Sequence, residues 1–165
     1  MHTRSFHVRA TLAVAALASL PVLAQSWQAD CQYVGVPTRE AVGDRDNHAL
    51  GGVQYTCRVL NGPLADAVLT GNNLFEWNGP RAVALFAEGV YRKPGTVAVF
   101  QVSQLNASVQ VADGKPVGNT SSGTARFQLA TGDAAPFAGK HFKFASKATG
   151  MNRFLLDTSI EETAE

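Results

Sequence analysis

Hydrophobic and polar side chains alternate along most of the chain after residue 25. In the segment GTARFQLA, Ala125, Phe127 and Leu129 share one face of the chain. The intervening Arg126 and Gln128 share the other face. A period of two is typical of a β-strand with one packed and one solvated face. The same alternation recurs in HFKFAS and NRFLLDT, so the pattern predicts an all-β fold.

The expected strands are short and evenly spaced. Turn-forming pairs such as Asn61-Gly62 and Asn78-Gly79 separate them. Such spacing is typical of a sandwich or a barrel. Consecutive hairpin connections favour a single antiparallel, mainly up-and-down β-barrel, with a β-sandwich as the alternative. The expected strands cover residues 27–34, 53–60, 67–77, 82–91, 96–104, 107–111, 123–130, 141–146 and 152–158.

The longest segment without strand character is the polar stretch PTREAVGDRDNHALGG, residues 37–52. Its glycines and aspartates favour a loop. Asp46 and His48 within it could form an acid–base or weak metal pair, but a solvated loop is the preferred interpretation. Because long ordered loops often carry function, this one could cover a barrel mouth.

Thr131, Gly132, Phe137 and Gly139 stand in the segment FQLATGDAAPFAGKHFKF. This segment resembles a strand–corner–strand unit of allene oxide cyclase and dirigent-type barrels, which are calycin-like. The resemblance covers one corner of the chain. It implies a calycin-like barrel with a central ligand cavity. No residue matches a catalytic position of the cyclases, so no catalytic role is carried over.

Residues 1–24 have the pattern of a cleavable secretory signal peptide. Arg4 and Arg9 precede the apolar run ATLAVAALASLPVLA, and Ala24 is a suitable small residue before the cleavage site. The run is shorter than the roughly 20 residues that a membrane-spanning helix needs. We therefore expect an exported protein, periplasmic or secreted, without a membrane span once the signal is removed. Residues 25–165 would form one β-barrel domain with a frayed acidic C-terminal tail.

Net charge argues against nucleic acid or an anionic membrane as the main partner. Removal of the signal peptide would leave 12 Lys and Arg residues against 13 Asp and Glu residues, and no basic block occurs.

Cys31 and Cys57 are the two cysteines of the chain. In the oxidising surroundings of an exported protein, a disulfide between them is the default expectation. Free thiols or a metal pair are the alternatives. Two cysteines without clustered histidines do not make a zinc site, so we expect no metal and no other cofactor.

Recognisable enzyme motifs are missing from the sequence. It contains no GxSxG elbow, P-loop, dinucleotide fingerprint or HExxH motif. His141 lies on the polar face of its expected strand, so a surface position is favoured over a role as a catalytic base. If that polar face instead pointed inward, His141 and Arg126 would line a cavity. The sequence favours a binding protein over an enzyme.

The segment TGNNLFEWNGPR, residues 70–81, is the strongest candidate for a site. Asn78-Gly79 predicts a two-residue hairpin turn, because both residues tolerate positive φ. In that register Glu76 faces Arg81 and Trp77 faces Pro80. The crowding of polar and aromatic residues would then be the consequence of a hairpin.

The same segment could also form the wall or rim of a ligand site. Phe75 and Trp77 would stack on the ligand, and Asn72 or Arg81 would form hydrogen bonds to it. Tyr91, followed by a basic residue, is a second candidate of the same kind. Asn72 and the asparagine after it are unusual in mid-strand, so they mark either a bulge or a ligand contact.

Three functions are compatible with these patterns. We expect an exported barrel that binds a small, partly apolar ligand in the barrel or at its mouth. The first alternative is an envelope protein–protein interaction or inhibitor module that uses its hairpin tips. The second is an isomerase or cyclase, which the resemblance to allene oxide cyclase would imply.

Overall fold

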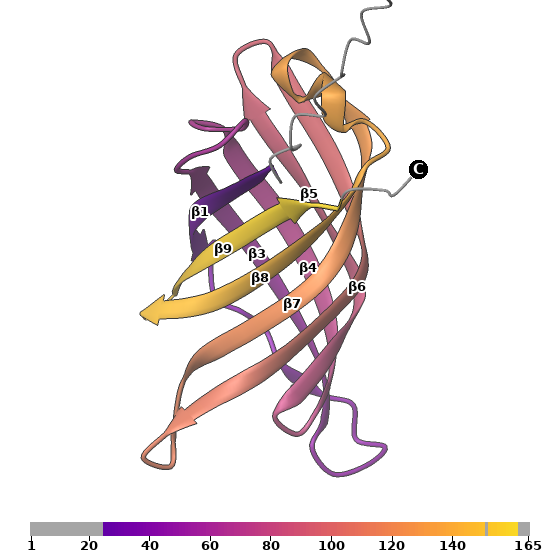
Figure 1. The fold of residues 1–165 in the computed structure, drawn as a ribbon. Helices are drawn as coiled ribbons and strands as arrows, with labels where there is room; N and C mark the ends of the chain where they lie inside the picture. The colour runs from indigo at the N-terminus through magenta and orange to yellow at the C-terminus, as the bar shows by residue number, and fades with distance from the viewer. Residues whose placement is uncertain (1–24, 151, 162–165) are drawn as a thin grey trace, which may run out of the picture.

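The structure, a computed structural model, describes residues 25–150 and 152–161 of the 165-residue chain. The described residues form a closed barrel of eight antiparallel strands with one additional short strand, and Figure 1 shows the strands curling around a common axis. The expected signal peptide and the end of the acidic tail lie outside the described residues. The predicted all-β barrel is therefore confirmed, and the alternative of a β-sandwich is wrong.

The strands follow one another around the barrel in the order of the chain. Each strand from β3 onward pairs with the next, and β1 closes the barrel by pairing with both β9 and β3. This is the up-and-down order that short hairpin connections predict. The strands are β1 (Ser26–Tyr33), β2 (Glu40–Ala41), β3 (His48–Val59), β4 (Val68–Asn78), β5 (Arg81–Lys93), β6 (Thr96–Ala112), β7 (Lys115–Ala130), β8 (His141–Gly150) and β9 (Arg153–Ile160), and a short 3-10 helix, η1 (Gly132–Phe137), joins β7 to β8.

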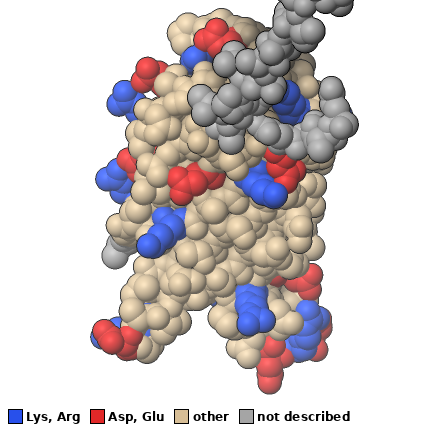
Figure 2. Space-filling model, viewed as in Figure 1, with Lys and Arg blue, Asp and Glu red and all other residues tan. Residues whose placement is uncertain are grey.

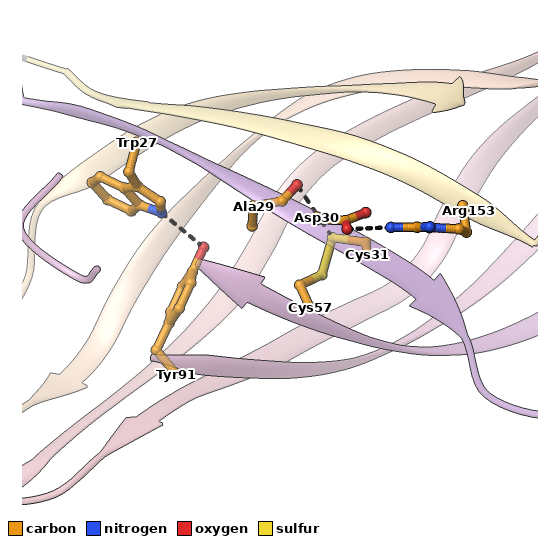
Figure 3. Close-up of a disulfide and its surroundings, with 7 residues drawn as sticks. All are labelled: Trp27, Ala29, Asp30, Cys31, Cys57, Tyr91 and Arg153. Carbon is orange, nitrogen blue, oxygen red and sulfur yellow. Dashed lines mark hydrogen bonds and ion pairs between the residues drawn. A yellow bond between two sulfur atoms is a disulfide. The ribbon is translucent and has the colours of Figure 1, made fainter. Parts of the chain in front are cut away.

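A disulfide joins the two strands whose pairing closes the barrel. Cys31 on β1 lies directly opposite Cys57 on β3, and the two form the expected disulfide. In Figure 3 the bond crosses between these strands, and Arg153 of β9 forms an ion pair with Asp30 of β1 beside it. The closing seam is thus held by a covalent bond on one side of β1 and an ion pair on the other.

Aromatic side chains fill the upper half of the barrel, the end that carries η1 in Figure 1. Trp27 lies among them, with ring centroids 5.8 Å from Phe137 and 6.4 Å from Phe142. Its indole Nε1 donates a hydrogen bond to the hydroxyl of Tyr91 at 3.3 Å, as Figure 3 shows. Phe137 belongs to η1 and closes this end of the core, being 2% exposed. The upper half is therefore a packed core.

The corner that resembles the cyclase and dirigent barrels has structural roles in this protein. Gly132 and Gly139 both have positive φ, which glycine adopts without strain. A Cβ on Gly132 would lie 2.1 Å from a backbone oxygen, so the corner also needs glycine there for space. Thr131 accepts a hydrogen bond from the backbone N–H of Val97. These residues cap the barrel.

The alternation of faces is confirmed for most of β7 but wrong at its end. Ala125 and Phe127 are fully buried, whereas Leu129 is 50% exposed. The register between β6 and β7 shifts at this point, so that Phe127 pairs with Phe100 and Leu129 pairs with Val99. The extra residue of this β-bulge turns Leu129 outward.

Two expectations about strand length were wrong. The segments 96–104 and 107–111 belong to one continuous strand, β6, whose register shifts in its middle. The end of the expected loop 37–52 is the start of β3, because residues from His48 onward pair with β4. Gly51 in this stretch faces inward, where a Cβ would lie 2.9 Å from Trp77 Nε1. Glycine is needed there for close packing. The glycines of this segment had suggested a loop, although this one lies in a strand.

The β4–β5 hairpin forms, but its register differs by one residue from the expected one. Asn78 pairs with Arg81 and Trp77 pairs with Ala82, so the turn residues are Gly79 and Pro80. Only Gly79 has positive φ, which fits a turn with glycine at its first central position. The expected Glu76–Arg81 pair is therefore wrong.

Candidate functional site

The lower half of the barrel contains a cavity of about 70 Å³. One buried water needs roughly 10–15 Å³ of such space, and an engineered cavity that binds benzene has about 150 Å³. Solvent reaches the lower end, because Asn119, Ser121 and Ser146 line the cavity and are only partly buried. The enclosed part could therefore hold a few waters, and a ring could enter only with its outer edge in the open mouth.

One wall of the cavity is aromatic. Phe75 and Trp77 of β4 lie side by side, with their ring centroids 6.0 Å apart. Tyr55 and Phe154 contribute a further edge-to-face pair, with centroids 5.7 Å apart. Rings in these arrangements offer flat apolar surfaces to a bound ring. The residues that line the cavity are Tyr33, Val53, Tyr55, Asn73, Phe75, Trp77, Tyr91, Phe100, Val102, Leu105, Ala107, Asn119, Ser121, Phe142, Phe144, Ser146, Phe154, Leu156 and Thr158.

The opposite wall carries hydroxyl and amide groups. Ser121 and Ser146, paired positions on β7 and β8, share a hydrogen bond of 2.7 Å between their hydroxyls. Asn119 lies close enough to Tyr33 to lower the pKa of its hydroxyl. The aromatic wall on β4 also carries one amide, Asn73, whose Oδ1 is shielded from solvent and has no hydrogen-bond partner among the described residues. The cavity thus joins an aromatic side to a polar side.

The ionisable side chains of the lining are three tyrosines. Burial raises the pKa of Tyr91 to about 12, although the hydrogen bond from Trp27 partly offsets the effect. Burial also raises the pKa of Tyr55 and of Tyr33, and Asn119 opposes it at Tyr33. All three are therefore neutral at physiological pH. The lining offers a neutral environment, which disfavours a charged ligand.

Three of the five predicted site residues face this cavity. Phe75, Trp77 and Tyr91 line it. Asn72 is exposed and pairs with Glu88 on the outer face of the sheet. Arg81 is exposed and borders an open hollow of about 700 Å³ at the lower end, which shares Ser121 and other lining residues with the cavity. The structure does not bring Asn72 and Arg81 together with the three aromatic residues that line the cavity.

Asn72 was the predicted site residue of the asparagine pair, whereas Asn73 is the one that lines the cavity, as the period-two rule could have indicated. Asn73 lies two residues before Phe75, so the two share a face of β4, whereas Asn72 shares its face with Glu76. A register shift follows at Leu74/Phe75, where β5 has an extra residue. The alternative of a bulge is confirmed, because the register shift lies next to the asparagine pair, and Asn73 lines the cavity.

The segment before β3 covers part of the lower mouth. The guanidinium of Arg39 stacks on the ring of Trp77, 4.7 Å from its centroid, and donates to the carbonyl of Gly79 at 2.9 Å. The carbonyl of Thr38 lies close enough to Gly51 that a Cβ there would be 2.8 Å away. Thr38 and Arg39 therefore pack against the part of the barrel wall that carries Trp77.

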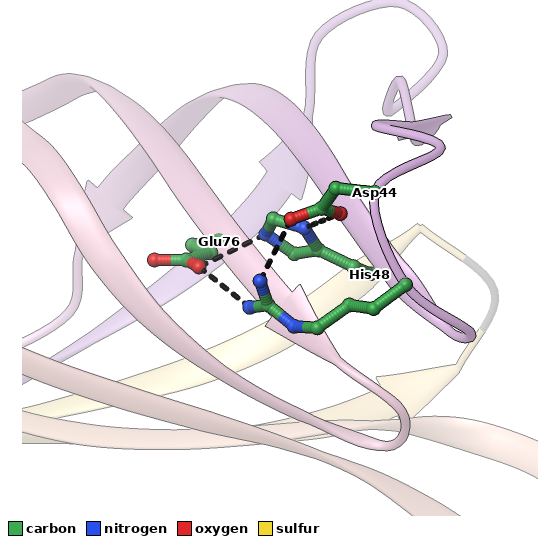
Figure 4. Close-up of polar contacts among 4 residues, drawn as sticks. Asp44, His48 and Glu76 are labelled. Atoms are coloured by element: carbon green, nitrogen blue, oxygen red, sulfur yellow. Dashed lines mark hydrogen bonds and ion pairs between the residues drawn. The ribbon is translucent and has the colours of Figure 1, made fainter.

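His48 lies in a polar cluster that fastens this loop to the barrel. Its Nδ1 bonds to Asp44 and its Nε2 to Glu76 at 2.9 Å, as Figure 4 shows. Arg45 contacts both carboxylates, at 2.9 Å and 3.1 Å. The hydrogen bond from His48 lowers the pKa of Asp44. The alternative pairing of His48 with Asp46 is wrong, because Asp44 and Glu76 bond to the two ring nitrogens.

The lower end of the barrel also has a distinct surface. Figure 2 shows charged side chains at its two lower tips, with a notch between them. Within the described residues, no group of three or more His, Cys, Asp and Glu side chains is arranged to hold a metal ion. Residues 25–150 and 152–161 include no helix of the length and hydropathy needed to cross a membrane.

Comparisons of the chain with protein-family models, with curated proteins and with solved structures found no match.

Proposed function

We propose that this protein is exported and binds a small, neutral, partly apolar ligand at the lower end of its barrel. The observation that carries the proposal is the solvent-connected cavity, which has an aromatic wall on β4 and a polar wall on β7 and β8. Binding sites commonly combine apolar walls with a few placed polar groups. The signal-peptide pattern of residues 1–24 and the Cys31–Cys57 disulfide support export.

Size and charge restrict the ligand. About 70 Å³ of enclosed space accepts a short chain or part of one small ring, with the remainder in the mouth. A charged group inside would lose its hydration without gaining an opposite charge from the lining. We therefore propose an uncharged compound no larger than about one ring within the enclosed part.

Native mass spectrometry of the protein purified from its own exported compartment tests this function. We expect a stoichiometric, non-covalent small molecule on the wild-type protein. Ala107→Phe, which fills the lined space, should lose it. Asn106→Phe adds the same ring at the next, solvent-exposed position and should keep it. A wild-type protein that carries no small molecule from that compartment would contradict the proposal.

A second candidate, an envelope protein–protein interaction, has one specific observation in its favour. Leu74 and Phe86 form a cross-strand pair on the outer face and are 40% and 45% exposed. Together with Val34 and Val36 they border an open groove of about 440 Å³. Exposed apolar groups that gather in this way often mark partner surfaces. Cross-linking in the exported compartment, compared between the wild type and Phe86→Asp, would show a partner-specific product that the variant loses.

A further inference from the structure

Asn73 occupies an otherwise apolar position in the wall of the cavity. Its paired neighbours are Val53 on β3 and Ala87 on β5. Its Oδ1 is shielded from solvent and has no hydrogen-bond partner among the described residues. A buried acceptor without a partner destabilises a folded protein, and native structures contain few of them. The presence of an asparagine at this position therefore calls for an explanation other than stability.

Three other polar side chains of the lining have hydrogen-bond partners. Ser121 and Ser146 bond to each other, and Tyr91 accepts from Trp27. Thr158 Oγ1 approaches the Tyr91 hydroxyl, although this contact falls outside hydrogen-bond geometry. In the described part of the chain, Asn73 Oδ1 has no hydrogen-bond donor as a partner. A donor group of a bound molecule would give this acceptor the hydrogen bond that it lacks.

The backbone next to Asn73 is irregular in the way that is common beside functional sites. The register between β4 and β5 shifts between Leu74 and Phe75, so that Leu74 pairs with Phe86 and Phe75 pairs with Ala84. Leu85 is the extra residue of this bulge. Bulges change the direction in which neighbouring side chains point and are frequent next to binding sites. Here the bulge lies between the orphan amide and the aromatic pair of Phe75 and Trp77.

We infer that the ligand is a compact neutral ring compound with a hydroxyl or N–H group that donates a hydrogen bond to Asn73 Oδ1. The ring lies against Phe75 and Trp77 on the same strand, and the donor reaches the amide two residues away. Asn73 is then the residue that distinguishes between ligands of equal shape. This inference rests on the proposed function, because it concerns the same cavity.

Three probes of similar shape test the inference: phenol donates and accepts a hydrogen bond, anisole only accepts, and toluene does neither. Calorimetry with the full chain gives the affinity for each. We expect phenol to bind about tenfold more tightly than toluene, the ratio that one net hydrogen bond provides. Anisole should bind like toluene. If anisole equals phenol, the amide nitrogen is the recognising atom and the inference is overturned.

Two leucine variants separate recognition from folding. Asn73→Leu keeps the approximate size of the side chain, removes the orphan acceptor and should abolish the preference for phenol. Asn72→Leu is the matched control: it changes the neighbouring, outward-facing asparagine and should keep the preference. Asn73→Leu should also raise the urea midpoint of the unliganded protein, because a buried unpaired group is lost. A purely structural asparagine would show the opposite change.

The outcomes distinguish the inference from the proposed function. If none of the three probes binds to the wild type, the cavity is not a site for small rings and the inference is contradicted; native mass spectrometry of the purified protein then decides the proposed function separately. If all three bind equally, or if Asn73→Leu keeps the preference for phenol, the function survives and the inference fails. If Asn73→Leu does not fold, the affinities of the wild type for the three probes still test the inference.

Discussion

Cys31 and Cys57 lie directly opposite each other on the two strands that close the barrel, so the disulfide joins positions that backbone pairing has already brought together. The bond therefore links β1 to the other side of a seam that forms only when the whole sheet has curled. Since the two residues are 26 positions apart, the bond also restricts a moderate loop in the unfolded chain.

The double variant Cys31→Ala/Cys57→Ala should fold but lose about 3–4 kcal/mol in free energy of unfolding, the chain-entropy value for a loop of this length. Urea denaturation measures this loss. A reducing agent should lower the urea midpoint of the wild type and leave that of the double variant unchanged. An equal effect of the reducing agent on both proteins would contradict the role of the bond.

The three tyrosines of the chain should not ionise near pH 10 while the barrel is folded. Tyr33, Tyr55 and Tyr91 all have raised pKa values because of burial, and that of Tyr91 is about 12. A tyrosine in the unfolded chain loses its proton at about pH 10. The unfolded state therefore binds fewer protons above that pH, and stability falls as the pH rises from about 10 towards the folded values. Tyrosinate absorbance should rise together with the loss of β-structure in circular dichroism; a rise near pH 10 with an intact barrel would be the contrary result.

His48→Gln should raise the pKa of Asp44 towards its usual value of about 3.9. The hydrogen bond from His48 is the largest cause that lowers this pKa. Because the folded pKa is lowered, the contribution of this contact is present above about pH 4 and is lost as the pH falls through the folded pKa. Carbon-detected NMR titration of the Asp44 carboxyl measures the shift. Asp46→Asn, which changes a neighbour that bonds to neither ring nitrogen, should leave it in place.

Gly123→Ala should cost about 1–3 kcal/mol, the usual range for overpacking. A Cβ at this position would lie 2.0 Å from the backbone oxygen of Gln104 and 2.7 Å from the ring of Phe144. Gly150→Ala is the matched control, because a Cβ there meets nothing within 4 Å. Urea denaturation of both variants compares them; equal stabilities would mean that the β6–β7 contact relaxes without cost.

The architecture could be predicted from the sequence because it depends on a period of two and on turn residues. Phe142 faces the core and His141 faces solvent, as the alternation in β8 predicts. The error at Leu129 has a different origin. A bulge adds one residue to a strand without any local signal, and every later side chain then changes face. The hairpin register failed for a related reason, since Asn78-Gly79 and Gly79-Pro80 both suit a turn.

The candidate site was only partly predictable. Phe75, Trp77 and Tyr91 could be selected because aromatic residues on an inward face line a barrel. Asn72 was predicted in place of Asn73, although alternate residues of β4 face the interior. Because Phe75 faces inward, Asn73 does so as well, and Asn72 faces outward. The cluster of Asp44, His48 and Glu76 could not be predicted, because Glu76 reaches the loop through pairing of β3 with β4.

The two tryptophans of the chain lie in the two differently packed halves of the barrel. Trp27 is in the aromatic core, whereas Trp77 lines the cavity beneath Arg39. Each half therefore has its own intrinsic fluorophore. In a Trp27→Phe protein the remaining emission reports events at the mouth, and in a Trp77→Phe protein it reports the integrity of the core, so entry of the proposed ligand and unfolding can be followed as separate optical signals in a pair of single-tryptophan variants.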